Sequence, residues 1–128
     1  MYDSINIQND FSSIGVNPQG GYVTFWKARS KSNEFEDILH IGSTIRRTGI
    51  PILFPYYGKA RQTGMHGFGR DSLWRVTTNQ EKILMELNAD DLDAVARTEY
   101  PYLFNASISI SPDPTTAAFI YSLSVKNE

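Results

Sequence analysis

Alternation of apolar and polar residues at every second position constrains this chain more than any other feature. Every second residue is apolar between residues 104 and 110, and the same holds between residues 119 and 125. Successive side chains of a strand point to opposite faces, so this period indicates two strands that each bury one face. Pro112-Asp113-Pro114 lies between them and has the composition of a turn. The sequence therefore predicts an antiparallel hairpin.

The same period recurs earlier in the chain. Residues 83–88 alternate, and residues 74–78 before them are the expected partner strand across a turn at residues 79–81. Residues 22–28 form another predicted strand, which residues 11–16 are expected to pair with. A single short helix is predicted over residues 90–97, where acids at the start and a base at the end suit the helix dipole. The predicted fold class is thus all-β and antiparallel.

Composition limits the classes of function. A chain of 128 residues corresponds to about one domain, and 41% hydrophobic with 20% charged residues is typical of a globular one. The absence of cysteine excludes disulfides and thiolate metal sites and favours a reducing, cytoplasmic location. The first residues lack the features of a secretion signal, and no apolar run is long enough to cross a bilayer. A net charge of -2 without a nucleic-acid-binding motif argues against nucleic acid as a partner.

Residues 48–69 break the alternation and are rich in glycine, proline and aromatic residues. Long irregular connections in compact domains are often functional. Between residues 38 and 70 there is no Asp or Glu, although the span contains Arg46, Arg47, Lys59, Arg61 and Arg70. A local positive field of this kind attracts anionic or oxygen-rich ligands. The alternative is a solvated basic surface without a ligand, and charge alone favours that alternative.

The run Met65–Asp71 combines three residue types that suit a polar site. His66 can exchange a proton near neutral pH. Gly67 and Gly69 allow close approach of the backbone to a ligand, and Arg70 offers several donors to hydroxyl or anionic oxygens. By residue type alone, a single histidine is more often structural than catalytic.

Four segments resemble the aldose 1-epimerase (galactose mutarotase-like) family. Residues 20–26 resemble its opening strand, and residues 100–104 its Tyr-Pro-Phe element. Residues 47–55 are similar to its Arg-Gly-Gly-Ile-Pro-Ile-Leu-Phe-Pro segment, with Thr48 in place of a glycine. Residues 66–71, followed by Trp74, resemble its His-Gly-Phe-Ala-Arg-Asp signature. The segments occur in the family's order and cover nearly the whole chain, so the resemblance implies an antiparallel β-sandwich of galactose mutarotase-like type.

The resemblance also implies an activity and site residues. The activity is interconversion of the α and β anomers of a hexose or hexose phosphate by acid–base ring opening, without a metal or organic cofactor. His66 corresponds to the first of the family's two histidines, as a hydrogen-bond partner or acid. Arg47, Lys59 and Arg70 are the expected substrate-binding residues, and they become phosphate contacts if the chain resembles the hexose-6-phosphate epimerase-like branch.

Length sets this chain apart from the family. The family's sandwich is about twice as long, so the resemblance implies that residues 1–128 form one domain, the truncated amino-terminal part of such a sandwich. No counterpart of the family's second histidine or glutamate base is identified. Two alternatives therefore stand beside the enzyme: a non-catalytic carbohydrate-binding β-sandwich and an inactive fragment. Half a sandwich leaves strand edges open, which predicts self-association.

Overall fold

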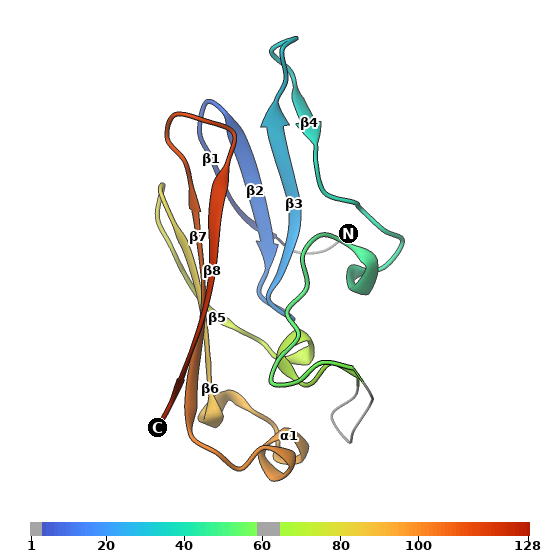
Figure 1. Cartoon of the computed structure of the whole chain (residues 1–128), viewed down its shortest axis with the longest axis vertical. Helices are drawn as coiled ribbons and strands as arrows, with labels where there is room; N and C mark the ends of the chain where they lie inside the picture. Colours follow the sequence, from blue (N-terminus) through green and yellow to red (C-terminus); the bar gives the residue numbers. More distant parts are fainter. Residues whose placement is uncertain (1–3, 59–64) are drawn as a thin grey trace.

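The computed structural model describes residues 4–58 and 65–128, and most of its regular secondary structure is β-strand (Figure 1). The first sheet contains β1 (Ile5–Gln8), β2 (Ser12–Asn17), β3 (Tyr22–Arg29) and β4 (Phe35–Asp37) in that order. The second contains β5 (Arg75–Thr78), β6 (Ile83–Asn88), β7 (Phe104–Pro112) and β8 (Phe119–Asn127), also in chain order. All neighbouring strands are antiparallel, so each sheet is a meander and the predicted fold class is confirmed.

The predicted hairpins are present with the expected pairing. β7 pairs with β8 from Phe104↔Asn127 to Pro112↔Phe119, and β5 pairs with β6. β2 pairs with β3, with a register shift between Gly15 and Val16. Two strands were not predicted, namely β1 and β4, which contain four and three residues.

The predicted helix is split in two. A 3-10 turn, η3 (Ala89–Asp91), is followed by the short helix α1 (Ala94–Glu99). The acidic residues explain the split, because they cap helix ends rather than continue one helix. Asp91 accepts a hydrogen bond from the backbone N–H of Asn88, and Asp93 accepts one from the N–H of Ala96. No helix among the residues described has both the length and the apolar character needed to span a membrane.

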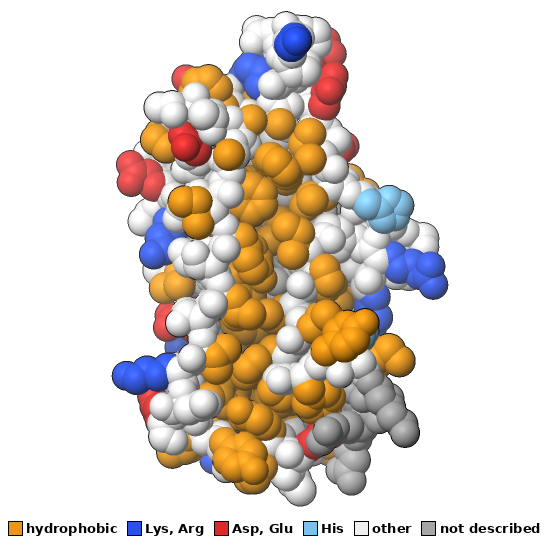
Figure 2. Space-filling model, in the orientation of Figure 1, with side chains coloured by type: hydrophobic (Ala, Val, Ile, Leu, Met, Phe, Trp, Pro, Cys, Tyr) orange, Lys and Arg blue, Asp and Glu red, His pale blue; other side chains and the backbone are white. Residues whose placement is uncertain are grey.

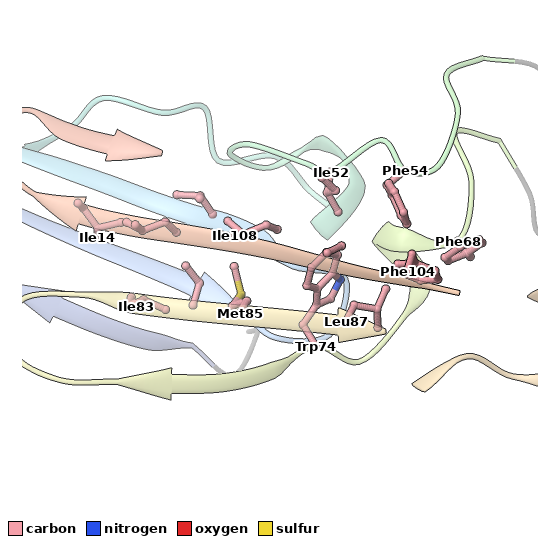
Figure 3. Packing of buried hydrophobic residues seen from close by; sticks show 14 of the residues in the cluster. Ile14, Ile52, Phe54, Phe68, Trp74, Ile83, Met85, Leu87, Phe104 and Ile108 are labelled. Carbon is pink, nitrogen blue, oxygen red and sulfur yellow. The ribbon is translucent and has the colours of Figure 1, made fainter. Parts of the chain in front are cut away.

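One apolar core lies between the two sheets. Ile83, Met85 and Leu87 of β6 are fully buried, as are Ile14 of β2 and Ile108 of β7. Figure 3 shows Ile14 and Ile83 towards one end of this core and Phe54, Phe68 and Phe104 grouped at the other, with Trp74 between the two groups. Burying side chains of this size stabilises the fold by about 1.5–3 kcal/mol each. Phe54 and Phe68 belong to the connection that carries the candidate site, so this connection packs into the same core as the sheets.

Candidate functional site

The connection between the two sheets is fixed to β3 by backbone contacts. Val23 and Ile50 exchange two hydrogen bonds, with N···O distances of 3.0 Å and 2.9 Å. Gly49 has φ +64°, and a Cβ there would lie 1.7 Å from the carbonyl oxygen of Val23. Only glycine permits this approach. The segment after Gly49 therefore has a defined position against the first sheet.

Thr48 stabilises the turn that leads into this contact. Its hydroxyl accepts a hydrogen bond from the N–H of Gly42 at 3.0 Å and donates one to the carbonyl oxygen of Thr44 at 2.8 Å. Its backbone is extended, with φ -115°. The position where the family pattern has a glycine thus requires no positive φ here, and the threonine side chain is buried and hydrogen bonded.

A second attachment holds the 3-10 turn η2 (Gly69–Asp71) against the turn between β2 and β3. The N–H of Gly20 donates to the carbonyl oxygen of Ser72 at 2.8 Å. The buried indole of Trp74 donates from Nε1 to the carbonyl oxygen of Gly69, also at 2.8 Å. Trp74 is fully buried in the core and at the same time supports the turn that carries Arg70.

His66 lies next to this turn in an unusual backbone conformation. Its φ is +65°, and its N–H donates to the carbonyl oxygen of Gly58 at 3.1 Å. The N–H of Gly58 in turn donates to Nδ1 of the imidazole at 2.8 Å. Because Nδ1 accepts this bond, the neutral imidazole carries its proton on Nε2. The ring of Tyr57 lies alongside, with centroids 4.9 Å apart. The half-buried His66 thus has a fixed orientation and a hydrogen-bond donor at Nε2.

The residues after His66 are packed tightly against Phe54. The N–H of Gly69 donates to the carbonyl oxygen of Phe54 at 2.9 Å, and a Cβ on Gly67 would lie 2.2 Å from that oxygen. The rings of Phe54 and Phe68 meet edge to face at a centroid distance of 5.6 Å. These contacts place His66 and Arg70 at either end of one rigid segment.

Charged groups gather around η2. Arg46, in the 3-10 turn η1 (Ile45–Arg47), forms an ion pair with Asp71. Both side chains are close to half exposed, so the pair stabilises the fold by at most about 1 kcal/mol. Nε of Arg70 and the hydroxyl of Tyr22 are buried, and neither has a hydrogen-bond partner among the residues described.

The Tyr22 phenol is a further polar group in this region. Burial raises its pKa above the ordinary value of 10.0, while the guanidinium groups of Arg46 and Arg70 act in the opposite direction. The phenol therefore keeps its proton at neutral pH and can act as a donor. Sequence analysis identified Gly20-Gly21-Tyr22 only as the start of a strand, because no sequence pattern reveals that a buried hydroxyl lacks a partner.

Three of the four predicted site residues lie on two segments that an ion pair joins. His66 and Arg70 share one segment, and Arg47 lies exposed on η1, which the Arg46–Asp71 pair joins to η2. Lys59 lies outside the described residues. Three residues were not predicted as part of the site, namely Tyr22, Arg46 and Asp71. Within the described chain, no cluster of three His, Cys, Asp or Glu side chains capable of holding a metal ion occurs.

An open groove of about 1000 Å³ lies elsewhere, between β1 and the turns that join β5 to β6 and β7 to β8. Its described lining includes Gln8, Asp10, Asn79 and Lys82 but none of His66, Arg47 and Arg70. The candidate site is therefore an exposed surface around η2 and His66 rather than part of this groove.

Comparison with known proteins yields structural neighbours but no sequence relatives. No family model matches the chain, and no curated protein matches it. A galactose mutarotase related enzyme from Lactobacillus acidophilus has 20% sequence identity and a TM-score of 0.78, covering 98% of this chain and 44% of that one. A galactose mutarotase-like protein from Lactobacillus casei has 18% identity and a TM-score of 0.79, with the same two coverages. The chain thus has a galactose mutarotase-like fold and spans less than half the length of these structures.

Proposed function

We propose that the surface around His66 and η2 binds a monosaccharide or sugar phosphate and takes part in the interconversion of its anomers. The fold shared with galactose mutarotase-related proteins supports a carbohydrate ligand. One observation carries the proposal: the bond from Gly58 to Nδ1 fixes the imidazole and leaves a donor at Nε2. Such a donor suits the oxygen atoms of a sugar ring.

Anomer interconversion needs two proton transfers. One group removes the proton of the C1 hydroxyl, and another donates to the ring oxygen as the ring opens. Each positioned group contributes about 10²–10⁴-fold to the rate. In this proposal His66 is the donor, and no second group is assigned, so the expected catalysis by residues 1–128 is modest.

The cationic residues suit the polar part of the ligand. Arg70 and Arg47 lie on the two 3-10 turns that the Arg46–Asp71 pair joins, and Lys59 is a third proposed contact. Guanidinium groups bind hydroxyl and phosphate oxygens through several parallel donors. A phosphorylated hexose is therefore expected to bind more tightly than the free sugar. The cytoplasmic location and the absence of a metal or cofactor remain predictions.

The second candidate is carbohydrate binding without catalysis. It is favoured by the arrangement of the described residues, in which the fixed imidazole shares one segment with Arg70 and no second proton-transfer group is assigned. A binding module needs the arginine residues and the fixed imidazole, but it does not need a second proton-transfer group. Both candidates predict saturable sugar binding, and only the first predicts a faster exchange of anomers.

Polarimetry of fresh α-D-glucose, α-D-galactose and glucose 6-phosphate tests the proposal. We expect a rate of anomer exchange above that of buffer, and His66→Ala should remove the excess. His40→Ala is the matched control, because His40 is the other histidine and lies exposed outside the segment 65–71. Equal effects of the two substitutions would contradict the role of His66. Saturable binding that requires His66, without any rate above buffer, would establish the binding module instead.

Calorimetric titration tests the charged contacts. Glucose 6-phosphate should bind more tightly than glucose. The difference should shrink as salt is added, because salt screens exposed charges, with a screening length of about 10 Å at 0.1 M. Arg70→Gln should reduce the advantage of the phosphate. If glucose and glucose 6-phosphate bind equally at low salt, the arginine residues do not contact a phosphate.

A further inference from the structure

β8 is the last strand in the order of the second sheet, and its core-facing side is covered only in part, because Phe119 and Tyr121 pack against the core whereas the positions after them are exposed. Leu123 pairs with Ile108 and Val125 with Ala106, so both side chains share a face with buried residues of β7. Yet Leu123 is 44% and Val125 42% exposed, against 0% and 2% for their partners. Figure 2 shows a continuous band of apolar side chains along this face of the molecule. Core-type side chains therefore line a surface that water reaches.

The free edge of β8 also lacks the usual protection against pairing. Natural edge strands are kept apart by charged side chains, prolines, bulges or short length. β8 is nine residues long and pairs with β7 without a register shift. It contains neither proline nor any charge from Phe119 to Val125, and Lys126 is the first charged residue. An edge of this length and composition is a template for another strand.

We propose that β8 pairs with β8 of a second copy of this chain, antiparallel about a two-fold axis at Leu123. Leu123 is the midpoint of Phe119–Asn127, so this register uses all nine residues of the strand. On the core-facing side, Leu123 meets Leu123 of the second copy, and Tyr121 meets Val125. Apolar cross-strand pairs of this kind stabilise sheets.

The opposite face of β8 is compatible with the same register. Ser122 then lies opposite Ser124 of the second copy, and Lys126 lies opposite Ile120. No like charges face each other, so this register brings no charge repulsion between the two strands. The pairing joins two four-stranded sheets into one eight-stranded sheet and joins the two apolar bands.

Analytical ultracentrifugation of the purified chain from micromolar to near-millimolar concentration tests the proposal. We expect a reversible monomer–dimer equilibrium, with protection of the β8 amides from hydrogen exchange that increases with concentration. Leu123→Lys should weaken dimerisation at least about 100-fold, because it places two like charges opposite each other in an apolar contact. Circular dichroism checks that the variant folds, which is expected because position 123 is 44% exposed in the monomer.

Two substitutions at Ile120 test the register itself. Ile120 is 67% exposed and faces the polar side of the sheet, so either substitution leaves the monomer core intact. Ile120→Glu creates two pairs with Lys126 per dimer and should tighten dimerisation about 2- to 30-fold, whereas Ile120→Lys should weaken it by a similar factor. Equal effects of the two changes would contradict this register.

Three outcomes would overturn the interface as a whole. The first is a chain that stays monomeric with unprotected β8 amides throughout the concentration range. The second is a dimer that Leu123→Lys does not weaken, which would place the contact on another surface. The third is a longer natural product that is monomeric and protects β8 internally, which would identify a strand of the same polypeptide as the occupant.

Discussion

The paired strands β6 and β7 and the connection from Gly49 to Trp74 are held in place by different physical means. In the strands, side chains at every second position enter the core, and register follows from that pattern. In the connection, backbone atoms approach one another closely, as Gly49 approaches Val23 and Gly67 approaches Phe54. The strands are specified by the apolar type of their side chains. The connection also buries apolar side chains, such as Phe54 and Phe68, but in addition it needs glycines where a side chain would collide with the backbone.

This difference determines how each region responds to substitution. A core position loses stability in proportion to the volume that is removed, and it accepts side chains of similar size. A glycine in close contact with a carbonyl oxygen accepts no Cβ without movement of the backbone. The candidate site therefore lies on the part of the molecule where the smallest changes have the largest effects.

The largest effect is expected for Gly49→Ala. The added Cβ would lie 1.7 Å from the carbonyl oxygen of Val23, and φ at this position is +64°. We expect a loss of more than about 4 kcal/mol in the free energy of unfolding, at the extreme of single substitutions, measured by denaturant unfolding. Gly58→Ala is the matched control, because φ is +93° but no atom of the residues described lies within 4 Å of the added Cβ. It should cost only about 1–2 kcal/mol, from backbone strain alone. Equal losses would mean that close approach is not what holds the connection.

The same contrast explains which parts of the fold were predictable. The hairpin of β7 and β8 was predicted because strong alternation surrounds turn residues. β1 and β4 were missed because four and three residues are too few to establish a period. The helix was predicted as one segment because composition does not reveal that Asp91 and Asp93 each cap a separate turn.

The site was predictable only in part. His66 and Arg70 were identified from a local signature, and both lie on the rigid segment beside Phe54. The partner of the His66 imidazole, the N–H of Gly58, was not predicted, because it depends on two positive φ angles in the connection. Tyr22 was not predicted either, since its proximity to Arg46 and Arg70 arises from contacts between distant segments.

A graded response is expected in the strands. Ile108 of β7 is fully buried, so Ile108→Ala should lower the free energy of unfolding by about 2–5 kcal/mol and Ile108→Val by about 0.5–1.5 kcal/mol. Ser109→Ala, on the polar face of the same strand, should stay within about 0.5 kcal/mol. Denaturant unfolding measures all three at one protein concentration. If Ile108→Val lowered the free energy of unfolding as much as Ile108→Ala, the strand would tolerate small changes no better than Gly49 does, and the contrast between the two regions would not hold.

The smallest effect concerns the turn between β7 and β8. Asp113 accepts hydrogen bonds from the N–H of Thr115 at 2.7 Å and from its hydroxyl at 2.8 Å. The first of these bonds is the main reason that the pKa of Asp113 lies below its ordinary value of 3.8. A carboxyl group with a lowered pKa in the folded state stabilises the fold above the unfolded pKa. That stabilisation is lost as the pH falls through the folded pKa.

Thermal unfolding on either side of pH 3.8 measures the contribution of this carboxylate to the turn. Asp113→Asn keeps a side-chain oxygen that can accept from Thr115 but removes the titration. We expect the variant to be slightly less stable than the original chain at neutral pH and to lose less thermal stability on acidification. If both proteins respond equally to acid, the charge of Asp113 is irrelevant to the turn. The hairpin would then depend on its side-chain pattern alone, which would make the contrast between the strands and the connection sharper.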